Sequence, residues 1–223
     1  MIELQDRHVA VIGLGESGLA MARWAAFKGA RVTVLDDRDS PPQRDALAAQ
    51  CPGAKLVCAA FTLAAVGNAQ VLAWSPGLSP LTGAAAALYQ AALDAGLPVV
   101  GELDLFADEL ARRAQDGYRP KVLASTGTNG KTTVTQLAGH LAAEAGLDVQ
   151  MAGNISPALL HALQQSTGAL QWSRRVGLES TRLPDLEDDL EAEAFGTATQ
   201  KLTKKLKSCT YGDTATITAG AFT

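Results

Sequence analysis

A glycine-rich segment at residues 11–18, VIGLGESG, contains the first residues whose spacing suggests chemistry. Gly13, Gly15 and Gly18 have the G-x-G-x-x-G spacing of a turn that binds the diphosphate of a nucleotide. The first glycine permits a sharp bend, the second lets the backbone approach the diphosphate, and the third lets helix and strand pack closely. The motif favours phosphate binding over a tight turn without a ligand. It leaves open whether that ligand is NAD or another nucleotide.

A second glycine-rich motif, STGTNGKTT, begins at Ser125. Gly127 and Gly130 would let successive backbone N–H groups turn inward around phosphate oxygens. Lys131 would place an ammonium group near the β- and γ-phosphates, and Thr132 would offer a hydroxyl to Mg²⁺. The motif therefore predicts ATP or GTP binding. It is a shorter form of the G-x-x-x-x-G-K-[ST] pattern, because Ser125 stands where that pattern has its first glycine.

Strand and helix patterns alternate around both motifs, which places each motif between a strand and a helix. The predicted strands are residues 8–12, 31–35, 69–74, 121–125 and 147–153. The predicted helices are residues 17–28, 84–95, 107–120 (with a hinge), 132–145 and 157–164. Alternation of this kind implies parallel pairing and right-handed crossovers, so the predicted fold class is α/β. We expect a domain boundary within residues 105–118.

The last part of the chain has a different composition. Residues 185–193 hold six acidic residues in nine positions, and residues 201–207 hold four lysines in seven. Blocks of like charge are usually solvated or disordered. We therefore expect residues 167–223 to be poorly ordered, with a weak strand pair at residues 210–223.

Composition excludes several classes of protein. The net charge of −4 gives no basic field for nucleic acid or an anionic membrane. No apolar run approaches the ~20 residues that span a bilayer, and the first residues lack the pattern of a signal peptide. Three cysteines, Cys51, Cys58 and Cys209, favour unpaired thiols in a reducing cytoplasm. We expect a cytoplasmic protein that neither binds nucleic acid nor enters a membrane.

At this point the sequence resembles a known family. TGTNGKTT is similar to the ATP loop of the Mur ligases and of the related folylpolyglutamate synthetases. The order GLGESG, DDRDSPP, SPGLSP, GELDLF at 101–106 and AGNIS at 152–156 resembles the Mur ligases that add D-glutamate in peptidoglycan synthesis. The resemblance covers residues 1–166. It implies a Rossmann-like, parallel-sheet UDP-sugar-binding domain at 1–106, the first part of a P-loop α/β central ATP-binding domain at 107–166, and a divergent tail at 167–223.

The resemblance also implies binding residues. Those that would lie along the diphosphate of the UDP-sugar are Leu14, Gly15, Glu16 and Ser17. Those that would lie beside the uridine are Asp36, Asp37 and Arg38, and those that would close over it are Ser75, Pro76 and Gly77. Asn154 would contact the muramoyl part. Those carried over to ATP form the second glycine-rich loop: Gly127, Thr128, Asn129, Gly130, Lys131, Thr132 and Thr133.

The implied reaction is ATP-dependent amide-bond formation. The alanyl carboxylate of UDP-N-acetylmuramoyl-L-alanine becomes an acyl phosphate, and the amine of D-glutamate displaces phosphate. Lys131 would be catalytic and Mg²⁺ would be held at Thr132, because two anions must meet in the first step. We expect a monomer with ATP and Mg²⁺ as cofactors.

The chain also departs from the family, and two alternatives stay open. After AGNIS the expected segment resembling LELSSFQLE is absent, and WSRRVGLESTRLPDLEDDLE stands in its place. A truncated, non-catalytic fragment that binds a UDP-sugar or ATP needs only the residues present. An NAD-dependent oxidoreductase would use Gly13 to Gly18 but would leave STGTNGKTT without a role. We treat Glu102 and Asp104 as surface residues of a linker.

Overall fold

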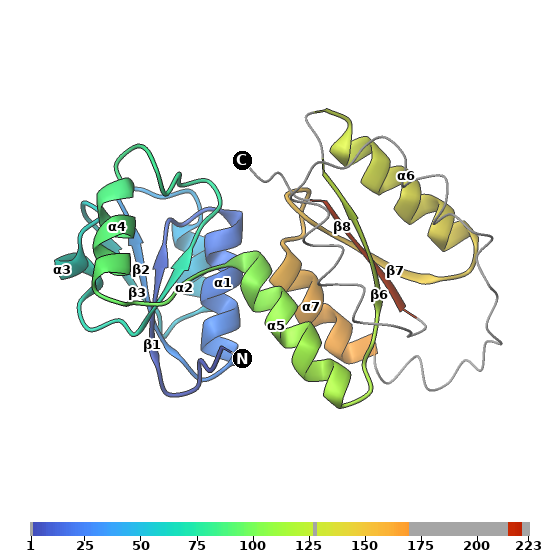
Figure 1. Cartoon of the computed structure of the whole chain (residues 1–223), viewed down its shortest axis with the longest axis horizontal. Coiled ribbons are helices and arrows are strands. Elements are labelled where there is room, and N and C mark those ends of the chain that lie inside the picture. Colours follow the sequence, from blue (N-terminus) through green and yellow to red (C-terminus); the bar gives the residue numbers. More distant parts are fainter. Residues whose placement is uncertain (1, 127–128, 170–213, 220–223) are drawn as a thin grey trace. The chain divides into compact units, whose positions relative to one another are not determined.

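The structure is a computed structural model that describes residues 2–126, 129–169 and 214–219 (Figure 1). The chain divides into two compact units. The first comprises Met1–Asp108 with Leu159–His161, and the second comprises Glu109–Ala158 with Ala162–Thr223. Within the described ranges, no helix combines the length and apolar character that a membrane span needs.

The first unit is built on a parallel five-stranded sheet with the order β3-β2-β1-β4-β5. Its strands are β1 (His8–Ile12), β2 (Arg31–Asp36), β3 (Lys55–Cys58), β4 (Val71–Trp74) and β5 (Val99–Gly101). All residues of β1 and β4 are buried. Strands of a parallel sheet that is covered on both faces have this continuous apolar character.

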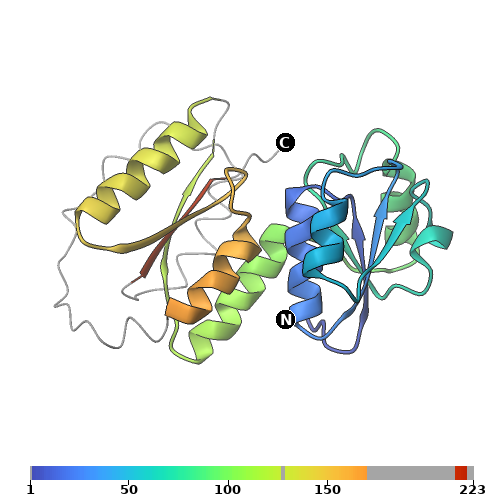
Figure 2. The ribbon, with the colours of Figure 1, turned by 180° about the vertical axis from the view of Figure 1, so that it is seen from behind.

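Helices cover both faces of this sheet. They are α1 (Glu16–Phe27), α2 (Arg44–Gln50), α3 (Leu63–Val66) and α4 (Ala86–Asp94). Figures 1 and 2 show α1 and α2 on one face and α3 and α4 on the other. A core cluster on the second face joins Ile12 and Leu72 of the sheet to Leu88 of α4. Trp74 packs edge-on against Tyr89 and donates its indole N–H to the carbonyl of Leu78 (2.8 Å).

The second unit contains a parallel three-stranded sheet with the order β6-β8-β7. Its elements are β6 (Lys121–Ser125), α6 (Lys131–Glu144), β7 (Asp148–Gly153) and β8 (Thr214–Ala219), with parts of α5 (Glu102–Gln115) and α7 (Leu159–Ala169). Figures 1 and 2 show α6 on one face of this sheet and α5 and α7 on the other.

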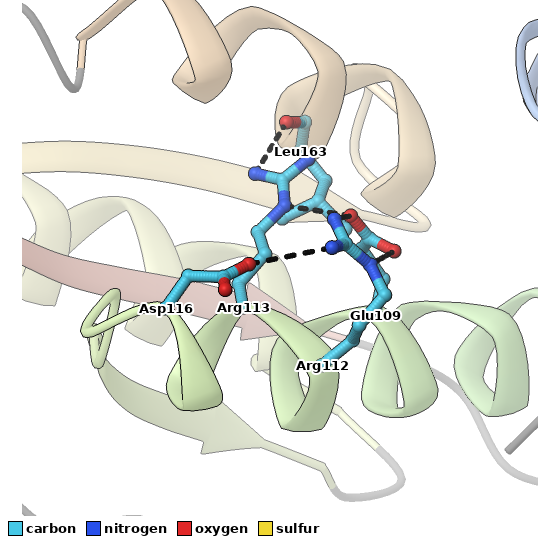
Figure 3. A network of polar contacts seen from close by, with 5 residues as sticks. All are labelled: Glu109, Arg112, Arg113, Asp116 and Leu163. Atoms are coloured by element: carbon cyan, nitrogen blue, oxygen red, sulfur yellow. Dashed lines mark hydrogen bonds and ion pairs between the residues drawn. The ribbon is translucent and has the colours of Figure 1, made fainter.

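A buried ion network links α5 to α7 within the second unit (Figure 3). The carboxylate of Glu109 accepts hydrogen bonds from Arg112 (2.7 and 3.0 Å) and from Arg113 (2.8 Å). Arg113 also donates to the carbonyl of Leu163 (3.2 Å). Arg112 reaches Asp116 at 3.4 Å. The hydrogen bond from Arg113 to Leu163 therefore joins α5 to α7, and the buried ion pair between Glu109 and Arg113 lies within α5.

The predicted α/β class is confirmed, and the strands predicted at 8–12 and 31–35 lie where expected. The helix predicted to begin at 107 was placed too late, because α5 begins at Glu102. Asp104 accepts a hydrogen bond from the N–H of Gly101 (2.8 Å), which caps the start of that helix. The short elements α2, β3 and α3 were not predicted.

The prediction for the end of the chain was wrong in one respect. The described part of residues 210–223 is a single strand, β8, which pairs in parallel with β6 and with β7. It does not form a pair with a second strand of its own segment. The poor order predicted for residues 167–223 falls outside the described residues, apart from β8 and the end of α7.

Candidate functional site

The predicted diphosphate turn connects β1 to α1 at the carboxyl end of the first sheet. Gly13 has a φ of +86°, a backbone conformation that L side chains rarely adopt. A side chain at Gly18 would collide with the carbonyl oxygen of Gly13. A Cβ at Gly15 would meet no atom within 4 Å. The fold therefore requires glycine at 13 and 18, whereas Gly15 borders open space, as a turn that admits a diphosphate should.

The start of α1 offers main-chain donors to that space. Gly15 is the residue before α1, and no side chain caps the helix there. Unpaired N–H groups in the first turn of a helix, with about half a positive charge, attract phosphate oxygens. Leu14 is fully buried, and its N–H donates to the carboxylate of Asp36 (2.7 Å). Glu16 is exposed and accepts a hydrogen bond from Gln43 (3.1 Å).

Asp36, at the end of β2, is buried, and its side chain is already engaged within the protein. Its Oδ2 accepts hydrogen bonds from the N–H of Leu14 (2.7 Å) and from Nη2 of Arg38 (2.7 Å). Its Oδ1 accepts from the N–H (3.0 Å) and Nε (2.7 Å) of Arg38. These bonds fill the four acceptor positions of a carboxylate. Asp36 therefore ties the glycine turn to the loop after β2.

The surroundings of Asp36 lower the pKa of its carboxyl group. Burial alone would raise the pKa of Asp36, but hydrogen bonds from Arg38 and from the Leu14 N–H outweigh burial and lower the pKa. The carboxylate is thus ionised at neutral pH. Arg38 is about half exposed, and Asp37 beside it is exposed. Both side chains are therefore accessible to a ligand.

Ser75 closes the other side of the turn. Its hydroxyl donates to the carbonyl of Gly13 (2.9 Å), and its N–H donates to the carbonyl of Ile12 (3.1 Å). Pro76 and Gly77 follow and are exposed. The structure therefore brings the predicted loops after β1, β2 and β4 together at the carboxyl ends of three neighbouring strands. Ligands of open α/β sheets bind at such a position, where the strand order reverses.

The predicted ATP loop lies between β6 and α6 in the second unit. Gly127 and Thr128 lie outside the described residues. Gly130 has a φ of +77° and precedes α6 without a side-chain cap. Asn129, Thr132 and Thr133 are exposed and Lys131 is half-buried, and the carbonyl of Lys131 accepts the hydroxyl of Thr135 (2.9 Å). The uncapped helix start and the hydroxyls beside it are compatible with a phosphate and its metal.

Asn154, the last of the residues predicted for the UDP-sugar, lies in the second unit. Asn154 is exposed and follows β7, in a loop that the N–H of Gly153 closes by donating to the carbonyl of Pro157 (3.0 Å). Asn154 thus belongs to the second unit, whereas the other residues predicted for the UDP-sugar belong to the first. Among the described residues, no three His, Cys, Asp or Glu side chains gather as a metal site.

One buried acid near the first loop was misjudged from the sequence. Glu102 is only 8% exposed, although we expected a residue on a linker surface. It accepts a hydrogen bond from the N–H of Leu160 at 3.1 Å, at the start of α7. Burial raises the pKa of Glu102. No local pattern marks such a residue, because its partners are far away in the sequence.

Comparisons with known proteins agree with this geometry. Residues 7–101 match the family described as Mur ligase MurD-like, N-terminal domain. The chain is 52% identical over 162 residues to a UDP-N-acetylmuramoylalanine--D-glutamate ligase of Burkholderia mallei (strain SAVP1), covering 72% of this chain and 32% of that protein. It is 52% identical over 172 residues to the enzyme of the same name from Albidiferax ferrireducens, covering 76% and 34%. The chain thus spans about a third of these curated relatives.

Among solved structures, the chain is similar to UDP-N-acetylmuramate:L-alanyl-gamma-D-glutamyl-meso-diaminopimelate ligase from Neisseria meningitides. The TM-score is 0.44 at 24% identity, covering 66% of this chain and 42% of the other. The sequence matches and the glycine turn at the end of β1 point the same way. Residues 7–101 match a MurD-like N-terminal domain, and the N-terminal part of this chain is similar to the Mur ligases.

Proposed function

We propose that this chain binds UDP-N-acetylmuramoyl-L-alanine and takes part in the ATP-dependent addition of D-glutamate to it, in peptidoglycan precursor synthesis. The observation that carries the proposal is the turn at Gly13, Gly15 and Gly18, open only at Gly15, in a region that matches the MurD-like domain. We propose that the predicted domains, 1–106 for the UDP-sugar and 107–166 for ATP, perform these two tasks in a cytoplasmic monomer.

In the proposed UDP-sugar site, the main chain of residues 14–17 lies along the diphosphate at the start of α1. The exposed side chains of Asp37 and Arg38 lie beside the uridine, and Pro76 and Gly77 lie over it. The arrangement is supported by the shared edge on which these loops lie and by the fixed position of the loop after β2, which Asp36 holds. Ser75 contributes by holding the turn at Gly13. Asn154 contacts the muramoyl part.

In the proposed ATP site, the loop from Gly127 to Thr133 cradles phosphate groups at the start of α6. Lys131 would offset the negative charge that develops when a carboxylate meets a phosphate, and Thr132 would hold Mg²⁺. When bound, ATP supplies the phosphoryl group that activates the alanyl carboxylate. Preorganised charges of this kind contribute about 2.7–4 kcal/mol for one donor in acyl transfer.

The test is the thermal melting of the whole chain with three ligands. UDP-N-acetylmuramoyl-L-alanine and ATP with Mg²⁺ are each added at a hundredfold excess over their Kd, and NAD is added at the same concentration as the UDP-sugar. Binding at that level stabilises a protein by about 2.7 kcal/mol, which raises the midpoint by about 5 °C or more. We expect shifts with the UDP-sugar and with ATP, and none with NAD. The variant Lys131→Ala should lose the ATP shift and keep the UDP-sugar shift.

A second measurement separates a ligase from a binding fragment. Phosphate release is followed with the UDP-sugar, D-glutamate and ATP–Mg²⁺ together, with D-glutamate omitted as the control. Release that depends on D-glutamate supports the ligase. A UDP-sugar shift without release would leave the non-catalytic fragment as the function, and a shift with NAD alone would overturn the proposal.

A further inference from the structure

Two hydrogen bonds close the loop that follows β4, residues 75–78, which we call the β4 loop. The carbonyl of Ser75 accepts the N–H of Leu78 (3.1 Å), which makes a tight turn with Pro76 and Gly77 at its centre. The indole N–H of Trp74 donates to the carbonyl of Leu78 (2.8 Å). The side chain of the residue that precedes the loop therefore holds the residue at its far end.

Both ends of the β4 loop also contact the diphosphate turn. The hydroxyl of Ser75 donates to the carbonyl of Gly13 (2.9 Å). At the other end, the side chain of Leu78 lies over Gly13, because a Cβ added to that glycine would be 2.9 Å from Cδ1 of Leu78. Pro76 and Gly77, between these two contacts, are exposed. A loop that is fixed at both ends presents its exposed middle in one orientation.

The indole ring that supplies the closing hydrogen bond is itself held in place. Trp74 is only 7% exposed and belongs to the core cluster on the α4 side of the sheet. Its ring meets Tyr89 edge-on, with 5.2 Å between the ring centroids and 78° between the planes. Any large apolar residue could fill this part of the core, whereas a buried donor that reaches the carbonyl of Leu78 requires the indole N–H.

We propose that Trp74 is a positioning residue for the UDP-sugar site: its indole N–H holds the β4 loop in the shape that places Pro76 and Gly77 over the uracil base. The inference rests on the proposed function, because it requires that a UDP group binds at this edge of the sheet. A loop that is ordered before binding spares the ligand the entropic cost of ordering it. Trp74 thus contributes to the recognition of the base without touching it.

The test compares the affinities of UDP and ADP, measured by calorimetry on the whole chain. Trp74→Phe keeps an aromatic ring in the core and removes the N–H. UDP binding should weaken about fivefold to tenfold, as expected for the loss of one neutral hydrogen bond. ADP has the same diphosphate but a larger base that the loop does not fit, so the ratio of the two affinities should fall about fivefold to tenfold as well.

A matched control separates positioning from general destabilisation. Trp24→Phe makes the same change at a second buried tryptophan of the first unit, in α1 on the other face of the sheet. It should lower the melting midpoint and leave the ratio of UDP to ADP affinity unchanged. If Trp74→Phe does not fold, 3-benzothienylalanine placed at residue 74 keeps the ring size and replaces the N–H with sulfur.

The outcomes distinguish this inference from the proposed function. A parent chain that folds but does not bind UDP overturns both. A parent that binds UDP, with the same ratio of UDP to ADP affinity as the Trp74 variants, overturns only the positioning role, whether both affinities stay constant or fall together. A parent that binds UDP and ADP equally well would show that the β4 loop does not recognise the base, and would also overturn that role.

Discussion

Asp36→Asn is the substitution that most directly probes how the first loop is held. The variant keeps the shape of the side chain but replaces one acceptor oxygen with an NH₂ group. All four hydrogen bonds of Asp36 come from donors, on Leu14 and Arg38. Whichever way the amide turns, its NH₂ group must face two of these donors. Two bonds are lost, and the ion pair with Arg38 is lost as well.

The expected loss of stability is about 2 kcal/mol. A hydrogen bond to a charged group contributes about 1.5–3 kcal/mol, and a buried donor left without a partner costs about 1–3 kcal/mol. The part due to Arg38 is small, because the side chain of Arg38 is 51% exposed and water can replace its partner. The Leu14 N–H is the costly group when the NH₂ takes the Oδ2 position, since that bond is buried. When the NH₂ takes the Oδ1 position, the two lost bonds are those from the N–H and Nε of Arg38.

Urea unfolding followed by tryptophan fluorescence measures this loss. Trp24 and Trp74 are both buried in the first unit, so their signals report on it. With a slope of about 1–3 kcal/mol per molar urea, the midpoint should fall by about 1–2 M. Asp37→Asn is the control, because Asp37 is exposed and its neighbour provides the contacts; it should change stability by less than about 0.5 kcal/mol. Equal midpoints for the two variants would refute this account of Asp36.

The difference in unfolding free energy between the parent and Asp36→Asn should depend on pH. The folded pKa of Asp36 is lower than its unfolded value of about 3.9. A lowered pKa stabilises the fold fully above the unfolded value, and the stabilisation is lost as the pH falls through the folded value. The difference in unfolding free energy between the parent and Asp36→Asn should therefore be constant from pH 7 to about 5 and shrink below about pH 4. A difference that grows on acidification would contradict the lowered pKa.

Four other substitutions test separate parts of the structure. Gly18→Ala should cost about 3 kcal/mol, because its Cβ meets the backbone in the preceding turn, whereas Gly15→Ala should leave stability within about 0.5 kcal/mol and weaken UDP binding at least tenfold by calorimetry. If Gly15→Ala bound UDP with the affinity of the parent, the diphosphate would not bind at this turn. Arg113→Leu should cost about 3–5 kcal/mol in urea unfolding, because it leaves a buried carboxylate with fewer partners; a loss below 1 kcal/mol would mean that the network is weakly coupled. Lys131→Ala should reduce phosphate release at least a hundredfold if the ligase reaction occurs, and a smaller effect would exclude a catalytic role.

Features whose causes are local could be predicted from the amino-acid sequence. β1 and the glycine turn after it could be read directly, because a continuous apolar run and glycines at fixed spacing are stereochemical requirements of a few neighbouring residues. The start of α6 after Gly130 follows from the same kind of rule. The resemblance to Mur ligases also rested on these short motifs, and the comparisons bear it out for the N-terminal part of the chain.

Only the tertiary structure decided which polar side chains are available to a ligand. Asp36 was expected beside the uridine of the UDP-sugar, but its four acceptor positions are filled by protein donors. Glu102 looked like a residue of a linker, but it is buried and accepts the N–H of Leu160 at the start of α7. β8 lies between two strands that are near each other in sequence and far from it. In each case the partner is brought close by the packing of distant segments, and hydrogen bonds over such separations leave no periodic signal in a single sequence.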